Sequence, residues 1–222
     1  GMGAVTGEMA RAAREAGAEL VTNARVTSIN PGTTQVRASV SVEIDGESHE
    51  LDAHRVLSNV SPWVLGELLG EPLPPTERPA GAQIKVNLLL SRLPRLADST
   101  VNPEQAFGGT FHINETYTQL EAAYVEAESG KIPSTLPCEI YCHSLSDPSI
   151  LGPELRASGA QTLTVFGLHA PHTLVTEKNN DEVRAQLVDA VIRSLNSVLA
   201  EPIEDVVLTD ANGNPCIEGK TT

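Results

Sequence analysis

A proline-rich segment at residues 71–79 limits the fold of this chain more than any other feature. It holds four prolines in nine residues. Proline removes a backbone N–H donor and fixes φ, so this segment cannot continue a helix or pair inside a central strand. We therefore predict that residues 71–80 are a linker between two parts, residues 1–70 and residues 81–222.

The first part is predicted to combine helices with antiparallel strands. Apolar residues recur at helical spacing from residue 5 to residue 16, and Gly17 is placed to end that helix. Residues 35–44 alternate between apolar and polar side chains, which is typical of a half-buried strand, and Asp45-Gly46 is a strong hairpin-turn sequence. The other elements expected here are strands at 18–22, 25–29, 48–51 and 54–59 and a short helix at 63–69.

The second part is predicted to be richer in grouped strands. Its longest helix is expected at 181–199, with a continuous apolar stripe, Asn180 as N-cap, and Asp181 and Glu182 at the positive end of the helix dipole. Because the strands do not alternate strictly with helices, we predict an α+β fold with a mixed, largely antiparallel sheet and helices on one face. The other elements expected here are strands at 83–90, 107–113, 139–145, 161–169 and 203–208 and a helix at 115–129.

Charge and composition argue against several classes of protein. The formal net charge is −14, from 29 acidic and 15 basic residues, whereas a nucleic-acid-binding surface needs a basic face. No apolar run approaches the roughly 20 residues of a membrane span, and no secretory leader is recognised. Three cysteines are an odd number, which argues against a disulfide framework and favours a cytoplasmic location.

Cys138 and Cys142, which lie four residues apart with His143 beside them, are the strongest candidate metal ligands. Within one strand the two thiols would share a face but lie about 13 Å apart along it, at about 3.3 Å per residue. No second ligand pair with zinc-type spacing is recognised. We therefore expect two buried apolar thiols and no metal site.

Sequence motifs assign no catalytic residue. A hydrolase nucleophile elbow, a phosphate-binding loop and a zinc-protease helix are all missing from the sequence. His169 and His172 flank a proline after a strand, which favours a loop role over acid–base chemistry. His112 and His143 are expected to be strand residues, and residues 210–215 carry too few acidic ligands for a calcium site.

Gly1, Gly3 and Gly7 are similar to a dinucleotide-binding fingerprint that lacks its usual context. The fingerprint occupies a βα turn, where a pyrophosphate reaches the N-terminus of a helix. Here no strand precedes the glycines, and their spacing is one residue too long. The glycines are therefore interpreted as a tight entry into a helix, and we expect the chain to be an excised part of a larger protein.

The segments 1–4, 17–20, 23–29 and 53–62 and the hairpin at Asp45-Gly46 together resemble the phytoene desaturase-like flavoproteins of the flavin amine oxidase superfamily. Residues 83–90 are similar to the entry into the substrate domain of that family. Residues 139–169 and 214–218 resemble its carotenoid/retinol saturase-like branch, also described as pyridine-nucleotide-disulfide oxidoreductase domain-containing. The resemblance covers nearly the whole chain but lacks the family's G-x-G-x-x-G fingerprint and its closing segment.

The resemblance implies a central fragment of an FAD-dependent oxidoreductase that acts on a hydrophobic small molecule. Residues 1–70 would be part of the FAD domain, and residues 81–222 would be the substrate-binding domain. The strand with Val26 resembles one whose backbone pairs with adenine, although a plain core valine is an equal alternative. Ser58, Asn59 and Pro62 match the turn that approaches the flavin. The apolar strand faces within 83–169 are expected to cover the substrate.

The fragment alone is expected to be inactive, not to retain FAD, and to self-associate through surfaces that the rest of the protein would cover. A different class of function stays open, namely a non-catalytic binding or interaction module with a groove on its mixed sheet. A small metal-dependent hydrolase ranks behind both because ligands are lacking.

Overall fold

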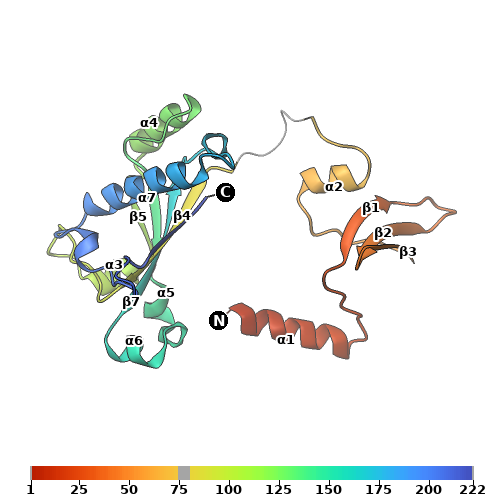
Figure 1. Ribbon diagram of the computed structural model, residues 1–222, viewed down its shortest axis with the longest axis horizontal. Coiled ribbons are helices and arrows are strands. Elements are labelled where there is room, and N and C mark those ends of the chain that lie inside the picture. Colours follow the sequence, from red (N-terminus) through yellow and green to blue (C-terminus); the bar gives the residue numbers. More distant parts are fainter. Residues whose placement is uncertain (1, 75–80, 222) are drawn as a thin grey trace. The chain divides into compact units, whose positions relative to one another are not determined.

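The computed structural model describes residues 2–74 and 81–221, and the chain divides into two compact units, Gly1–Pro79 and Ala80–Thr222 (Figure 1). Gly1 of the glycine-rich start and residues 75–80 of the predicted linker lie outside the described residues. Both units combine helices with an antiparallel sheet, which confirms the predicted α+β class. Among the described helices, none is both long enough and apolar enough to cross a membrane.

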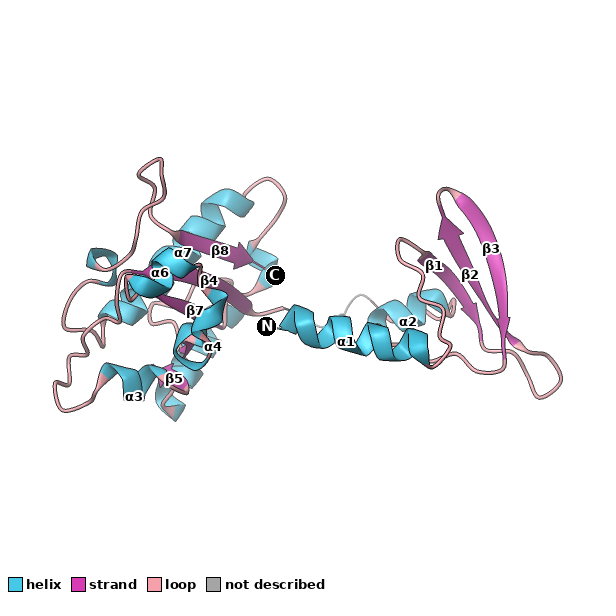
Figure 2. Cartoon of the chain, turned by 90° about the horizontal axis from the view of Figure 1, so that it is seen from below, coloured by secondary structure: helices cyan, strands magenta, loops and turns pink. Residues whose placement is uncertain are grey.

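The first unit contains a three-stranded sheet in the order β1-β2-β3 (Figure 2). Asp45 and Gly46 both have positive φ, at 52° and 83°, which is the geometry of the tight turn predicted between β2 and β3. The expected strands at 18–22 and 54–59 are wrong, because neither segment finds a partner strand and both are irregular. The elements of this unit are α1 (Met2–Glu15), β1 (Arg25–Asn30), β2 (Ala38–Ile44), β3 (Glu47–Ala53) and α2 (Pro62–Leu68).

The second unit is built on a five-stranded sheet in the order β5-β6-β7-β4-β8, in which every neighbouring pair is antiparallel. The last strand of the chain, β8, therefore pairs with the first strand of the unit, β4. The strands are β4 (Gln83–Leu90), β5 (Thr110–Ile113), β6 (Cys138–Tyr141), β7 (Gln161–Leu168) and β8 (Ile217–Thr221). The helices are α3 (Pro103–Phe107), α4 (Tyr117–Glu128), α5 (His143–Ser146), α6 (Pro153–Ala157) and α7 (Asn180–Asn196).

Helix α7 lies along one face of this sheet and closes the core (Figure 1). Gly167 on β7 and Gly219 on β8 permit the close approach, because a Cβ on either glycine would lie 2.5 Å from a carbon atom of a neighbouring side chain. The core is made of alternate residues of the central strands and the apolar stripe of α7: Ile84, Val86, Leu88, Leu90, Cys138, Ile140, Leu163, Val165, Leu187, Val191 and Leu195.

Several element boundaries differ from the sequence-based expectations. Helix α7 begins at Asn180 and is preceded by Asn179 as N-cap, because the Asn180 side chain instead accepts a hydrogen bond from Thr221 Oγ1 (2.9 Å) in β8. Strand β5 begins only at residue 110, because Asn102 Oδ1 caps a short preceding helix by accepting from Glu104 N (2.9 Å). Strand β6 ends at Tyr141. The expected strand continued to residue 145, but residues 143–145 are helical and belong to α5.

The expected final strand at 203–208 is also wrong. Ile203–Asp205 form a single 3₁₀ turn, and the Ile203 side chain is completely buried. Beyond this turn, Val207 forms an isolated bridge to Leu90, so only one residue of the segment pairs as a strand would. The segment fills the end of the core, and the true final strand is β8, which the sequence analysis missed.

A buried carboxylate ties the loop after β4 to the loop after α7. Glu201, whose side chain is 9% exposed, accepts hydrogen bonds from Arg92 Nη1 (2.7 Å), Arg95 N (3.0 Å) and Arg95 Nη2 (3.0 Å). The Arg92 guanidinium, followed by the Arg95 backbone and side chain, holds the pKa of Glu201 far below its ordinary value. Glu201 thus connects the loop after β4 to the loop after α7.

We expect Glu201→Gln to lower the free energy of unfolding by about 1–2 kcal/mol at pH 7, since charged hydrogen bonds are lost. A depressed carboxylate pKa contributes stability above the unfolded-state pKa, near 4.5, and this stability disappears as pH falls through the lower folded-state value. Urea unfolding between pH 3 and pH 7 measures both effects. Wild-type stability should fall on acidification more steeply than that of the variant, and parallel pH curves would contradict the assignment.

Candidate substrate-binding face

The face of the five-stranded sheet that points away from α7 carries most of the polar side chains of its strands. Successive residues of a strand point to opposite faces. Since Ile84, Val86 and Leu88 face α7, their neighbours Lys85, Asn87 and Leu89 lie on the other side. We call this second side the open face. By strand register it comprises Gln83, Lys85, Asn87, Leu89, Thr110, His112, Glu139, Tyr141, Thr162, Thr164, Phe166, Leu168, Glu218 and Lys220.

This arrangement corrects one expectation from the sequence. The apolar strand faces within residues 83–169 were expected to cover a substrate. Instead, they are buried against α7, with Ile84, Val86 and Val165 each 0% exposed. A ligand of this sheet therefore meets the open face, whose side chains are mixed in character.

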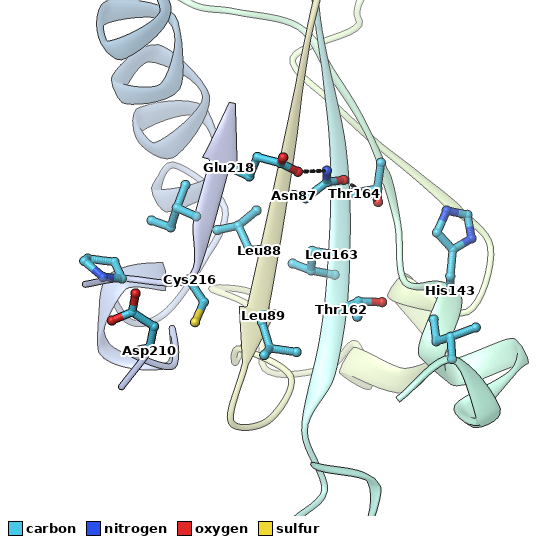
Figure 3. A pocket seen from close by; sticks show the side chains of 13 residues that line it. Asn87, Leu88, Leu89, His143, Thr162, Leu163, Thr164, Asp210, Cys216 and Glu218 are labelled. Carbon is cyan, nitrogen blue, oxygen red and sulfur yellow. Dashed lines mark hydrogen bonds between the residues drawn. The ribbon is translucent and has the colours of Figure 1, made fainter. Parts of the chain in front are cut away.

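A cavity of about 490 Å³ lies on the open face where β4, β7 and β8 are adjacent (Figure 3). The side chains that lie on this side of the sheet are a mixture of apolar ones (Leu89, Ile150 and Pro215) and polar ones. Leu88, Leu163 and Ile217 also line the cavity, but their side chains lie on the α7 side of the sheet. Pockets for small molecules commonly have this composition, with a few placed polar groups that fix the orientation of the ligand. The lining residues are Asn87, Leu88, Leu89, His143, Ile150, Thr162, Leu163, Thr164, Asp210, Pro215, Cys216, Ile217 and Glu218.

A hydrogen-bonded row crosses three strands at one side of this cavity. Thr164 Oγ1 donates to Asn87 Oδ1 (3.1 Å), and Asn87 Nδ2 donates to Glu218 Oε2 (3.0 Å), as Figure 3 shows. The hydrogen bond from Asn87, followed by the one from Lys220, lowers the pKa of Glu218. The row thus holds a carboxylate in its charged form at the rim and fixes which way the Asn87 amide faces.

Two further polar residues of the cavity have different roles. Asp210 organises its own loop, because it accepts hydrogen bonds from Asn214 N (2.9 Å), Asn214 Nδ2 (3.2 Å) and Asn212 N (2.8 Å). The bonds from Asn214, followed by the one from Asn212, lower the pKa of Asp210. Thr162 Oγ1 is buried and has no hydrogen-bond partner within the described residues. Asp210 is therefore committed to the loop, whereas the Thr162 hydroxyl is buried and unpaired among the described residues.

The histidine of this cavity is not held as a general base. His143, its one lining histidine, stacks on Tyr141 with ring centroids 6.0 Å apart. No hydrogen bond between His143 and a carboxylate or hydroxyl side chain occurs among residues 2–74 and 81–221, so it lacks the positioned partner of a general base. His143 is therefore suited to contacting a bound molecule rather than to moving its protons.

The structure separates the four candidate cofactor-binding residues. Val26 lies in β1 opposite Val42 and is 39% exposed, whereas Pro62 is the first residue of α2. Of the four, only Ser58 lines a second cavity, of about 570 Å³. Asn59 lies beside it in the irregular segment before α2. The other walls of this cavity are Ile29, Pro31, Ala38, His54, Arg55, Val56, Leu57, Leu65 and Leu69.

Two of the three cysteines are buried, as expected from the sequence, but they do not lie in one strand. Cys138 and Cys142 are both buried, and burial raises the pKa of the Cys138 thiol to about 12. Cys142 lies outside the strand, at the start of α5, and its Sγ is 3.4 Å from Ser144 Oγ. Both thiols are structural. Cys216, the partly exposed cysteine of the open-face cavity, was missed because it lies outside any recognised motif.

Comparison with known proteins gives the family context of these sites. The chain matches the family described as flavin containing amine oxidoreductase over residues 1–212. It is 53% identical, over 223 residues that cover 100% of the chain, to an uncharacterised protein of Mycobacterium tuberculosis strain H37Rv and to one of Mycobacterium bovis. The chain spans 40% of the length of these relatives. The chain belongs to the flavin-containing amine oxidoreductase family.

Proposed function

We propose that this chain is the central part of an FAD-dependent, phytoene dehydrogenase-like oxidoreductase that acts on a hydrophobic small molecule. In this proposal residues 1–70 contribute to the FAD domain, residues 71–80 are the linker, and residues 81–222 form the substrate-binding domain of a cytoplasmic enzyme. The observation that carries the proposal is the open-face cavity, in which Leu89, Ile150 and Pro215 supply apolar surface and a hydrogen-bonded row supplies a few polar anchors. Such a site orients a substrate for chemistry that a cofactor supplies.

The first unit offers features that fit the nucleotide part of FAD. Strand β1 is an edge strand that pairs only with β2 among the described residues, so its other edge has backbone groups free to pair with an adenine. In this proposal Val26 contributes such a backbone contact. Ser58, Asn59 and Pro62 form the turn near the flavin, beside the cavity of about 570 Å³. When bound, FAD would accept a hydride from the substrate.

The chain by itself is expected to be inactive, because it spans 40% of the length of its mycobacterial relatives. It is also expected to self-associate, since Val5, Met9 and Leu57 are 53%, 67% and 98% exposed. Val5 and Met9 lie on the same side of α1, and exposed apolar surface of this kind commonly contacts another part of a protein or another copy.

A segment exchange tests the proposal. The matching 223-residue segment of the mycobacterial relative is replaced by this chain, which is 53% identical to it. We expect the chimera to bind FAD stoichiometrically and to be reduced anaerobically by a hydrophobic substrate. The 222-residue chain alone should show neither property. Flavin absorbance measures both.

Two outcomes would contradict the proposed function. A complete relative and a chimera that both fold without binding flavin would refute the oxidoreductase assignment and favour a non-catalytic binding module. Turnover by the isolated chain would refute its inactivity.

Thr164→Val in the chimera is a matched variant, because it keeps the shape of the side chain but removes the hydroxyl that holds Asn87. It should raise KM without loss of bound FAD.

A further inference from the structure

A second group of polar side chains lies on the open face, away from the cavity, at the outer edge formed by β5 and β6. His112 on β5 is directly opposite Glu139 on β6 in the strand register. Just after β5, Asn114 has a positive φ of 58°, and Glu115 follows it. The chain folds back here, and His112 Nδ1 lies 2.7 Å from Glu115 Oε2. Three ligand-type side chains thus meet at one place.

The geometry of this group fits a metal ion. One nitrogen of His112 and one carboxylate oxygen each from Glu115 and Glu139 all lie within 4.8 Å of one another. Around a tetrahedral Zn²⁺, bonds of about 2.0–2.2 Å place neighbouring ligand atoms roughly 3.4 Å apart. The side chain of His112 is 49% exposed, so small rotations can close the group onto an ion.

The unsatisfied carboxylate is the second, independent observation. The Glu115 side chain is only 18% exposed, and its Oε1 atom is buried with no hydrogen-bond partner among the described residues. Glu139 receives a hydrogen bond from the Tyr141 hydroxyl (3.1 Å). Within residues 2–74 and 81–221, His112 is the only basic side chain that forms an ion pair with either carboxylate. A buried oxygen without a donor is costly, and an ion is one of the groups that satisfies it.

We propose that His112, Glu115 and Glu139 form a binding site for a divalent first-row transition-metal ion, with Zn²⁺ as the probe. The ion lies between His112 Nδ1 and the Glu115 carboxylate, which binds it through both Oε1 and Oε2. The neutral imidazole then keeps its single proton on Nε2, so Nδ1 is free to bind the ion. One imidazole and two carboxylates are borderline-to-hard ligands that suit Zn²⁺ or Mn²⁺. Three protein ligands leave a fourth position for water or another molecule.

No metal site was expected from the sequence, because Cys138, Cys142 and His143 have no second ligand pair with zinc-type spacing. The available signal was the His-x-x-Glu spacing of residues 112–115, which is weak without Glu139 from another strand. The proposal is independent of the assigned flavin chemistry, and its test uses no flavin.

The test titrates ZnCl₂ into the purified 222-residue chain by calorimetry. We expect one Zn²⁺ per chain with micromolar or tighter affinity, and a higher Tm with zinc because the ion binds the folded state. His112→Gln and Glu139→Gln should each weaken binding by at least about tenfold. X-ray absorption of the zinc complex should show nitrogen and oxygen ligands and no sulfur.

His143→Gln and Cys216→Ser are the matched controls, because both residues lie on the open-face cavity rather than in the proposed site. Binding should be unchanged in both. Circular dichroism and zinc-free Tm values establish that each variant is folded. The proposal is refuted if the wild-type chain binds no zinc at millimolar concentration, if folded His112 and Glu139 variants bind it as tightly as wild type, or if sulfur appears among the ligands.

Discussion

Replacing Leu88 by alanine is expected to lower the free energy of unfolding of the second unit by about 3 kcal/mol, whereas Leu89→Ala should lower it by less than about 1 kcal/mol. The two leucines are neighbours in β4, but Leu88 is 3% exposed in the core under α7 and Leu89 lies on the open face. Alanine at position 88 loses the buried methyl groups and leaves a cavity that close-packed neighbours fill only partly.

Urea unfolding followed by circular dichroism measures the two changes under identical conditions. Because both substitutions remove the same atoms from the same strand, the difference between them reports burial rather than strand propensity. Equal losses, or a larger loss at Leu89, would mean that the open face is buried in solution and would refute the assignment of the two faces.

Gly167→Ala is expected to destabilise the second unit by about 2 kcal/mol through overpacking. The added Cβ would lie 2.5 Å from Leu136 Cδ2, 2.9 Å from Ile84 Cγ2 and 3.0 Å from Val191 Cγ2. All three neighbours are buried in the core, so they cannot move aside without disturbing the contact between α7 and the sheet.

Gly109→Ala is the matched control, because a Cβ at that position meets nothing within 4 Å. Its Tm should stay close to that of the wild type, while that of Gly167→Ala falls by several degrees. A Gly167 variant as stable as the Gly109 variant would show that α7 does not approach β7 as closely as described.

Elements with a strong local pattern could be predicted from the sequence. Strand β4 has the predicted limits, and the Asp45-Gly46 turn has the two positive φ values that its residue types favour. The apolar stripe also predicted α7, but the predicted helix ended too late. Leu199 lies beyond the end of α7 and forms an isolated β-bridge with Leu96. Each of these elements is specified by a few neighbouring residues, so it can be predicted without knowledge of distant contacts.

The candidate sites could be predicted far less well. The polar row of Asn87, Thr164 and Glu218 joins residues that are up to 131 positions apart in the chain. His112 and Glu139 are opposed only because β5 pairs with β6. Neither spacing forms a motif, because such sites depend on the order of strands in the sheet rather than on local residue pattern.

The sequence by itself determined the α+β class and the membership of the flavin amine oxidase superfamily, because periodicity and similarity are properties of contiguous residues. Only the tertiary structure decided that β8 completes the sheet, although its residues Glu218, Gly219 and Lys220 have weak strand character. It also decided which face of β4 is core. Both faces of that strand carry leucine, and only the packing of α7 determines which leucine is removed from water.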